Sequence, residues 1–168
     1  MVKQNMVFLL LGSNIEPRYN YIKKAEEKIA KDIGKILQSS NIYESEAIGF
    51  KADTSFLNKV IFIETKFTAL NILNNIHIIE NRLGRVRNSL GYTSRTLDID
   101  ILYFNDDIIN SGLLTVPHPR LHERRFTLLP LKEIAPDFTN PALKITNKKL
   151  FEICSDNSDV KIYNIGKI

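Results

Sequence analysis

The chain has 168 residues, which suits one domain or two small ones, and a hydrophobic share of 43% is enough for a packed core and argues against disorder. Apolar runs fall short of the roughly 20 residues that a membrane-spanning helix needs, and the single cysteine, Cys154, excludes an internal disulfide or a multi-cysteine metal site. Lys and Arg total 23 against 19 Asp and Glu, which gives a net charge of +4. We therefore expect one soluble domain over residues 1–168, cytoplasmic and monomeric, with no membrane partner.

Hydrophobic periodicity predicts alternating strands and helices. Residues 6–11 are apolar throughout, as in a buried strand, whereas Pro17 suits the first turn of a helix and Thr68 can cap another. In chain order, the expected elements are a strand over 6–11, a helix from Pro17 to Gly34, a strand over 35–43, a loop over 44–55, a strand over 56–65, a helix from Thr68 to Gly84, a strand over 96–104 and a short strand over 108–109.

The order strand, helix, strand, strand, helix, strand is that of the ferredoxin-like βαββαβ unit. This is an α+β fold with a mainly antiparallel sheet and both crossover helices on one face. After Pro117 we expect short helical pieces whose length is limited by Pro130, Pro136 and Pro141. These pieces can cover the other face of the sheet, which gives a three-layer αβα arrangement.

Arginines cluster in one part of the chain. Seven of the eight fall between Arg82 and Arg125, and the three histidines, His77, His118 and His122, lie in or beside that stretch. Arg presents a planar fork of donors that suits phosphate or carboxylate, whereas Lys acts as a point charge. The cluster indicates a localised anion site, and chance together with surface ion pairs is the alternative.

Asp98 and Asp100 carry the strongest chemical signal. Because strand side chains alternate between faces, both project from one face of the expected 96–104 strand with Cα atoms about 6.6 Å apart. At that separation two unit charges repel by about 2.5 kcal/mol at an effective dielectric of 20. Their strand neighbours are apolar, so this is not a solvated charged face. Hard carboxylate oxygens suit Mg²⁺, which we favour over the alternative that arginines neutralise the pair as structural ion pairs.

Carboxylate-held Mg²⁺ beside arginine forks is what phosphoryl transfer requires, because that chemistry depends on positioning and charge neutralisation. Arg85 and Arg87 precede the aspartates in a loop, Arg95 directly precedes their strand and Arg124 follows it. The sequence lacks the Walker loop that ends in Lys-Ser or Lys-Thr and the protein-kinase motif set, and the Gly-Ser-Asn at 12–14 is too short for a phosphate loop. These residues therefore predict phosphoryl transfer by an enzyme that is neither a Walker-loop protein nor a protein kinase.

Several motifs, in order along the chain, resemble one family. They are Gly12-Ser13-Asn14, Glu80, Gly84-Arg85-Val86-Arg87, Arg95-Thr96-Leu97-Asp98-Ile99-Asp100-Ile101, Thr115-Val116-Pro117-His118 and the run over 130–136. Together they span residues 6–138 and resemble 6-hydroxymethyl-7,8-dihydropterin pyrophosphokinase of the folate pathway. The Arg-Thr-Leu-Asp-x-Asp string followed by Val-Pro-His is the most specific part of the resemblance.

The resemblance implies that the pterin hydroxyl attacks the β-phosphorus of ATP, that pyrophosphate is transferred and that AMP leaves. It implies that Asp98 and Asp100 hold two Mg²⁺ ions against the triphosphate, and that Arg85 and Arg95 lie on a mobile catalytic loop. The implied ATP-binding residues are His77, Glu80, Arg87, Ile101, Thr115, His118 and Arg124. The implied pterin-binding residues are Ser45, Ile48 and Gly49 in the closing loop, Asn58 at the ring edge, and Phe56 and Phe126 on the ring faces.

The residues alone leave the pterin assignments open. Without the resemblance, a strand-end amide that bonds the backbone would be the favoured interpretation of Asn58, and Phe56 and Phe126 are each ordinarily core aromatics. A zinc pair of His118 and His122 is not expected, because no third ligand is evident.

Two rival functions share some of these features. An RNA-binding ferredoxin-like module fits the topology and the basic charge, but the aromatic strings of such modules are absent and paired aspartates would repel a phosphate backbone. We therefore expect no nucleic-acid partner. A Mg²⁺-dependent nucleotidyltransferase could use Asp98 and Asp100 on another acceptor, and it would release pyrophosphate rather than AMP.

Overall fold

The computed structural model describes residues 3–87 and 93–166, and a six-stranded sheet with antiparallel pairings forms its centre. The strands lie in the order β5-β1-β4-β3-β8, and β2 also pairs with β4. Their bounds are Asn5–Ser13 for β1, Lys35–Ser39 for β2, Tyr43–Ser45 for β3, Phe56–Thr65 for β4, Asp98–Phe104 for β5 and Val160–Ile162 for β8. A separate hairpin pairs β6, Ile109–Asn110, with β7, Thr115–Val116.

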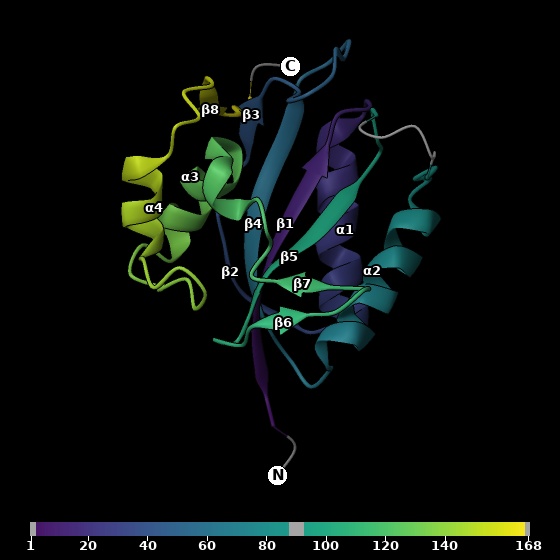
Figure 1. The fold of residues 1–168 in the computed structure, drawn as a ribbon. Coiled ribbons are helices and arrows are strands. Elements are labelled where there is room, and N and C mark those ends of the chain that lie inside the picture. Colours follow the sequence, from purple (N-terminus) through teal and green to yellow (C-terminus); the bar gives the residue numbers. More distant parts are fainter. Residues whose placement is uncertain (1–2, 88–92, 167–168) are drawn as a thin grey trace.

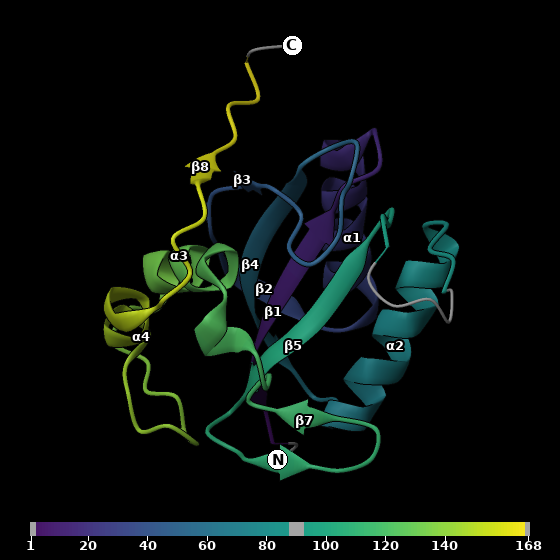
Figure 2. The same cartoon turned by 45° about the horizontal axis from the view of Figure 1, so that its top comes forward.

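Helices cover both faces of the sheet (Figures 1 and 2). One face carries α1, Arg18–Asp32, and α2, Ala69–Arg82. The other carries α3, Arg125–Ile134, and α4, Asn147–Ile153, with a short 3₁₀ turn over Leu121–Glu123. The α+β class and the three layers expected from the sequence are confirmed. No helix within the described ranges is long and apolar enough to cross a membrane.

Alternation along β1 separates two hydrophobic cores. Leu9 and Leu11 pack with the α1 and α2 residues, whereas Phe8 and Leu10 pack with the α3 and α4 residues. Both faces of β1 are therefore buried, which explains its uninterrupted apolar run.

The same alternation decides where the paired aspartates lie. In the β1–β5 register Asp100 is opposite Leu10 and Asp98 is opposite Gly12. Directly opposite residues share a face of an antiparallel pair, so both carboxylates lie on the α3 side of the sheet. Ile99, which stands between them, packs into the core on the α1–α2 side.

The expected single strand over 35–43 is wrong, because the chain breaks at Ser40 and forms β2 and β3 instead. The Ser40 Oγ accepts a hydrogen bond from the Val60 N–H at 3.0 Å, so a side chain replaces a backbone group in the ladder at this point. Pairing then resumes and includes Glu44 and Ser45, so the following loop begins later than expected.

Three further differences lie in the second half of the chain. The expected strand over 96–104 begins only at Asp98, and the short strand lies at 109–110 rather than 108–109. The limit set by Pro130 is wrong, because α3 continues past this buried proline. In the tail, the Oγ1 of Thr146 caps α4 by accepting the Lys149 N–H at 3.3 Å. The three-residue β8 is too short to show a strand period in the sequence.

Candidate active site

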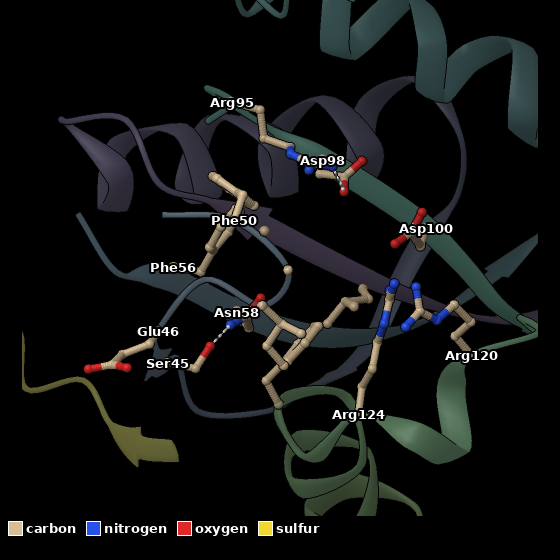
Figure 3. A pocket seen from close by; sticks show the side chains of 15 residues that line it. Ser45, Glu46, Phe50, Phe56, Asn58, Arg95, Asp98, Asp100, Arg120 and Arg124 are labelled. Carbon is tan, nitrogen blue, oxygen red and sulfur yellow. Dashed lines mark hydrogen bonds and ion pairs between the residues drawn. The ribbon is translucent and has the colours of Figure 1, made fainter. Parts of the chain in front are cut away.

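A pocket of about 110 Å³ lies on the α3 side of the sheet, between the strand ends, the β3–β4 loop and the segment over 120–126 (Figure 3). The expected site residues among its lining are Ser45, Ile48, Gly49, Phe56, Asn58, Arg95, Asp98, Asp100, Arg124 and Phe126. The lining residues that the sequence analysis did not assign to the site are Leu10, Gly12, Glu46, Phe50 and Arg120. The structure thus brings the expected pterin-binding residues together with Arg95, Asp98, Asp100 and Arg124 in one cavity.

Seven expected residues lie outside this lining. They are His77, Glu80, Arg85, Arg87, Ile101, Thr115 and His118. Ile101 is buried in the core beneath α1 and α2, and Thr115 is exposed on β7. Three of the seven lie next to the aspartates through their ion pairs and hydrogen bonds: Glu80, Arg85 and His118.

Asp98 lies between two guanidinium groups. Its Oδ1 is 2.6 Å from Arg85 Nη1 and its Oδ2 is 2.7 Å from Arg95 Nη1, and 23% of the side chain is exposed. Asp98 thus makes the arginine ion pairs that the alternative interpretation expected. A carboxylate has about four lone-pair positions, so these contacts leave acceptor capacity toward the pocket.

Glu80 on α2 binds Arg85, one of the two arginines that pair with Asp98, and also binds Arg87. Its side chain is 1% exposed, and it pairs with Arg85 Nη1 and Arg87 Nη2, each at 2.5 Å. It also accepts the backbone N–H of Ile99 at 2.9 Å. Burial raises the pKa of Glu80, while the Ile99 N–H and the two arginines act in the opposite direction. In this arrangement Glu80 orders Arg85 beside Asp98 and holds Arg87 through its other carboxylate oxygen.

Asp100 is in a different electrostatic situation. Burial, followed by the charge of Asp98, raises the pKa of Asp100 to about 7, and Arg124 acts in the opposite direction. Figure 3 shows the side chains of Arg120 and Arg124 directed toward Asp100 from the far side of the pocket. Two carboxylates on one strand face, one of which is costly to ionise, fit a divalent cation with oxygen ligands.

His118 stands beside Asp100 as a neutral donor. Its Nε2 is 4.0 Å from Asp100 Oδ2, and its Nδ1 accepts the backbone N–H of Arg120 at 3.2 Å, which leaves the proton on Nε2. Burial, followed by the charge of Arg124, lowers the pKa of His118 to about 4. The imidazole is therefore uncharged at neutral pH and can donate to an anionic oxygen.

The opposite wall combines an amide with aromatic rings. Asn58 is 3% exposed, and its Nδ2 donates to Ser45 Oγ at 2.9 Å. The Phe50 and Phe56 rings meet edge to face with centroids 6.1 Å apart, and the Arg95 guanidinium lies 5.8 Å from the Phe56 centroid. This wall suits a flat ring with polar edge atoms.

Two of the additional lining residues had a signal in the sequence. Gly12 directly follows an apolar run, and a Cβ at this position would lie 3.4 Å from the Asn58 Oδ1 and narrow the pocket. Phe50 is the one aromatic residue of the sequence between Tyr43 and Phe56, in a loop, where a large exposed side chain often serves a site.

The family model described as 7,8-dihydro-6-hydroxymethylpterin-pyrophosphokinase (HPPK) matches residues 8–136. The chain belongs to this family. Membership confirms the enzyme class expected from the sequence, a pyrophosphokinase.

Curated relatives agree with this assignment. The 2-amino-4-hydroxy-6-hydroxymethyldihydropteridine pyrophosphokinase of Aquifex aeolicus is 39% identical over 152 residues, covering 90% of this chain and 92% of the relative. The Bacillus subtilis protein of the same name is 38% identical over 131 residues, covering 77% and 78%. The folic acid synthesis protein fol1 of Pneumocystis carinii is 35% identical over 160 residues, and the match spans 95% of this chain but only 21% of that protein.

Solved HPPK-DHPS structures share the fold. The Plasmodium falciparum HPPK-DHPS A437G variant with SDX-DHP gives a TM-score of 0.76 at 18% identity, covering 90% of this chain and 46% of that one. An HPPK-DHPS in complex with substrates gives a TM-score of 0.74 at 15% identity, covering 89% and 43%. The chain thus spans less than half the length of these structures, and the likeness concerns the architecture.

Proposed function

We propose that this pyrophosphokinase acts in folate synthesis and transfers pyrophosphate from ATP, with Mg²⁺, to the hydroxymethyl group of 6-hydroxymethyl-7,8-dihydropterin. One observation carries the proposal. A single pocket places an aspartate and arginine wall, suited to a triphosphate, opposite an amide and aromatic wall, suited to a pterin. The names of the Aquifex and Bacillus relatives, which specify this pterin, support the acceptor.

The phosphate wall combines negative and positive groups. Asp98 and Asp100 would hold Mg²⁺, which, when bound, would neutralise charge on the triphosphate oxygens. No group of three or more His, Cys, Asp or Glu residues within 3–87 and 93–166 could hold a metal, so phosphate oxygens and water would complete the coordination. Arg124, from the far side of the pocket, and the neutral His118, beside Asp100, would donate to phosphate oxygens.

The pterin wall recognises a flat ring by its edge and its faces. After its bond to Ser45, the Asn58 amide still offers one N–H and its carbonyl oxygen, which match the alternating donors and acceptors of an aminopyrimidinone edge. Phe56 and Phe126 supply the apolar faces, and Gly12 leaves the room that the ring needs.

The reaction forms one bond and breaks one. The hydroxymethyl oxygen bonds to the β-phosphorus, the bond from that phosphorus to the oxygen shared with the α-phosphate breaks, and AMP departs with the electron pair while the hydroxyl proton passes to solvent. Arg95, held beside Asp98 at 2.7 Å, is positioned to donate to the phosphoryl oxygens as charge shifts between them.

Nucleotide product analysis tests the proposal. Purified protein is incubated with ATP, Mg²⁺ and reduced hydroxymethylpterin, and an Asp100→Asn variant serves as the matched control. We expect AMP to form only with the pterin, in step with a diphosphorylated pterin. ADP would indicate ordinary phosphoryl transfer, and free pyrophosphate would indicate nucleotidyl transfer; either result would overturn the proposal.

A further inference from the structure

Asn14 directly follows β1 and is 1% exposed. Its Oδ1 accepts the backbone N–H of Arg95 at 2.7 Å, and its Nδ2 donates to Ser94 Oγ at 3.0 Å. Its own backbone N–H donates to the Arg95 carbonyl at 3.1 Å. Three hydrogen bonds therefore fix the segment 93–97, which leads into β5, against the end of β1.

The backbone carbonyl of Asn14 is bonded to the other wall of the pocket. It accepts a hydrogen bond from Thr54 Oγ1, and Thr54 belongs to the β3–β4 loop that closes the amide and aromatic wall. Arg18 holds the same loop by donating to the Ser55 carbonyl at 2.8 Å. This end of the loop is thus anchored, and one of its anchors is Asn14 itself.

Arg95 is the group that this arrangement places. Its backbone N–H and carbonyl both bond to Asn14, while its guanidinium bonds to Asp98 at 2.7 Å. A displacement of Asn14 must therefore move the Arg95 backbone relative to Asp98. A continuous chain of hydrogen bonds thus connects Thr54 to Asn14, Asn14 to Arg95, and Arg95 to Asp98.

We propose that Asn14 is a positioning residue that couples the β3–β4 loop to Arg95, so that the seating of the loop around its ligand sets the position of the arginine on the phosphate wall. The roles of the two walls rest on the proposed function, whereas the coupling rests on the hydrogen bonds alone. A purely structural Asn14 would complete the backbone bonds at a strand end, but it would pass no effect from Thr54 to Arg95.

Thr54→Val provides the decisive variant, because it removes one hydroxyl that does not contact Arg95. Thr127→Val is the matched control, since the buried Thr127 Oγ1 has no hydrogen-bond partner among the described residues. Asn14→Ala removes both side-chain bonds, and Asn14→Asp retains an acceptor for the Arg95 N–H and one for the Ser94 hydroxyl proton. The measurements are the exchange rate of the Arg95 amide proton by NMR, ATP affinity by calorimetry, and kcat.

We expect Thr54→Val to speed exchange of the Arg95 amide by about 2- to 10-fold, the range of one net hydrogen bond, and to lower kcat by a similar factor at unchanged ATP affinity. Asn14→Ala should have the larger effect, and Asn14→Asp should restore much of the rate. If exchange in Thr54→Val equals that in Thr127→Val, the coupling is disproved, even where wild-type transfer is intact. If exchange responds but wild-type protein transfers no pyrophosphate, the coupling stands and the proposed function fails.

Discussion

The carboxylate of Glu80 accepts the backbone N–H of Ile99 at 2.9 Å, between the two aspartates of β5. Because β5 is at the edge of the sheet, this N–H points away from β1 and is available to a side chain of α2. The same carboxylate pairs with Arg85 and Arg87. A single buried group therefore holds both the strand that carries the aspartates and Arg85, which pairs with Asp98.

Glu80→Gln separates these two tasks. Glutamine keeps an acceptor for the Ile99 N–H but removes the charge that Arg85 and Arg87 share. Hydrogen bonds to charged groups contribute about 1.5–3 kcal/mol each, so we expect kcat to fall by about 10- to 100-fold while the fold persists. Steady-state kinetics beside Glu27→Gln, an exposed control on α1, checks this. A rate within twofold of that control would contradict the ordering role of Glu80.

Asp100→Asn should separate activity from stability. Because the pKa of Asp100 is raised in the folded protein, the folded state binds the carboxyl proton more tightly than the unfolded chain does. The contribution of this protonated carboxyl to the free energy of unfolding is therefore complete below about pH 4 and is lost as the pH rises toward about 7. In metal-free buffer we therefore expect the thermal midpoint of Asp100→Asn to equal or exceed that of the wild type at pH 8. Turnover should fall by about 10²-fold or more.

Calorimetric scans at pH 4 and pH 8, in buffer with a chelator, provide the measurement. The wild type should lose stability relative to Asp100→Asn between these values. A variant that is less stable than the wild type at pH 8 would contradict the raised pKa of Asp100. A variant that retains turnover near the wild-type rate would remove Asp100 from the proposed metal site.

Arg95→Ala should slow the chemical step more than it weakens ATP binding. The guanidinium bonds Asp98 at 2.7 Å and lies over the Phe56 ring, between the two walls of the pocket. Arg95→Lys keeps the charge but loses the planar fork, so it should give an intermediate rate. Single-turnover kinetics with ATP titrations checks this, with Arg82→Ala as an exposed control. Loss of ATP affinity at an unchanged chemical rate would show a binding role instead.

Asp156 supports the first turn of α3 from the C-terminal segment. Its Oδ2 accepts the Arg125 N–H at 2.8 Å, and its Oδ1 accepts the Ser158 N–H at 2.9 Å. Asp156→Ala should cost about 1 kcal/mol of unfolding free energy, as the loss of a helix cap does. Urea unfolding checks this against Asp159→Ala, in which only an exposed pair with Lys161 is lost.

The contribution of Asp156 to the free energy of unfolding should decrease in acid. Burial by itself raises the pKa of Asp156, but the hydrogen bonds from Arg125 and Ser158 outweigh burial and the pKa lies below its ordinary value. The contribution is therefore present above the ordinary carboxyl pKa and is lost as the pH falls through the lowered one. The difference between wild type and Asp156→Ala should narrow below about pH 4; a difference that grows with acid would contradict it.

Local pattern was enough to predict the features that depend on near neighbours. The apolar run at 6–11 indicated a buried strand, and the alternation along 96–104 placed Asp98 and Asp100 on one face, as the β1–β5 register shows. The break at Ser40 could not be predicted, because it depends on a hydrogen bond to Val60, twenty residues away.

In the candidate site, too, contacts between separate segments could not be predicted from the sequence. The clustering of arginines indicated an anion site, but which arginines line the pocket and which partners they have could not be predicted: Arg82 and Arg125 lie outside its lining. Asp98 forms ion pairs with Arg85 and Arg95. Arg120 lines the pocket because the chain after Pro117 folds back toward the aspartates. Apart from the local pair of Arg95 and Asp98, these relationships depend on how loops fold back onto the sheet, for which a single sequence carries no periodic signal.

The path of the β-phosphorus of ATP distinguishes pyrophosphate transfer from phosphoryl and nucleotidyl transfer. With enzyme in excess over ATP that carries ³²P at the β-position, together with Mg²⁺ and the reduced pterin, one turnover is quenched and the products are separated. We expect the label to appear on the pterin, with unlabelled AMP as the only new nucleotide and no labelled ADP at any time. Label in ADP or in free pyrophosphate would contradict one-step transfer of pyrophosphate by this site.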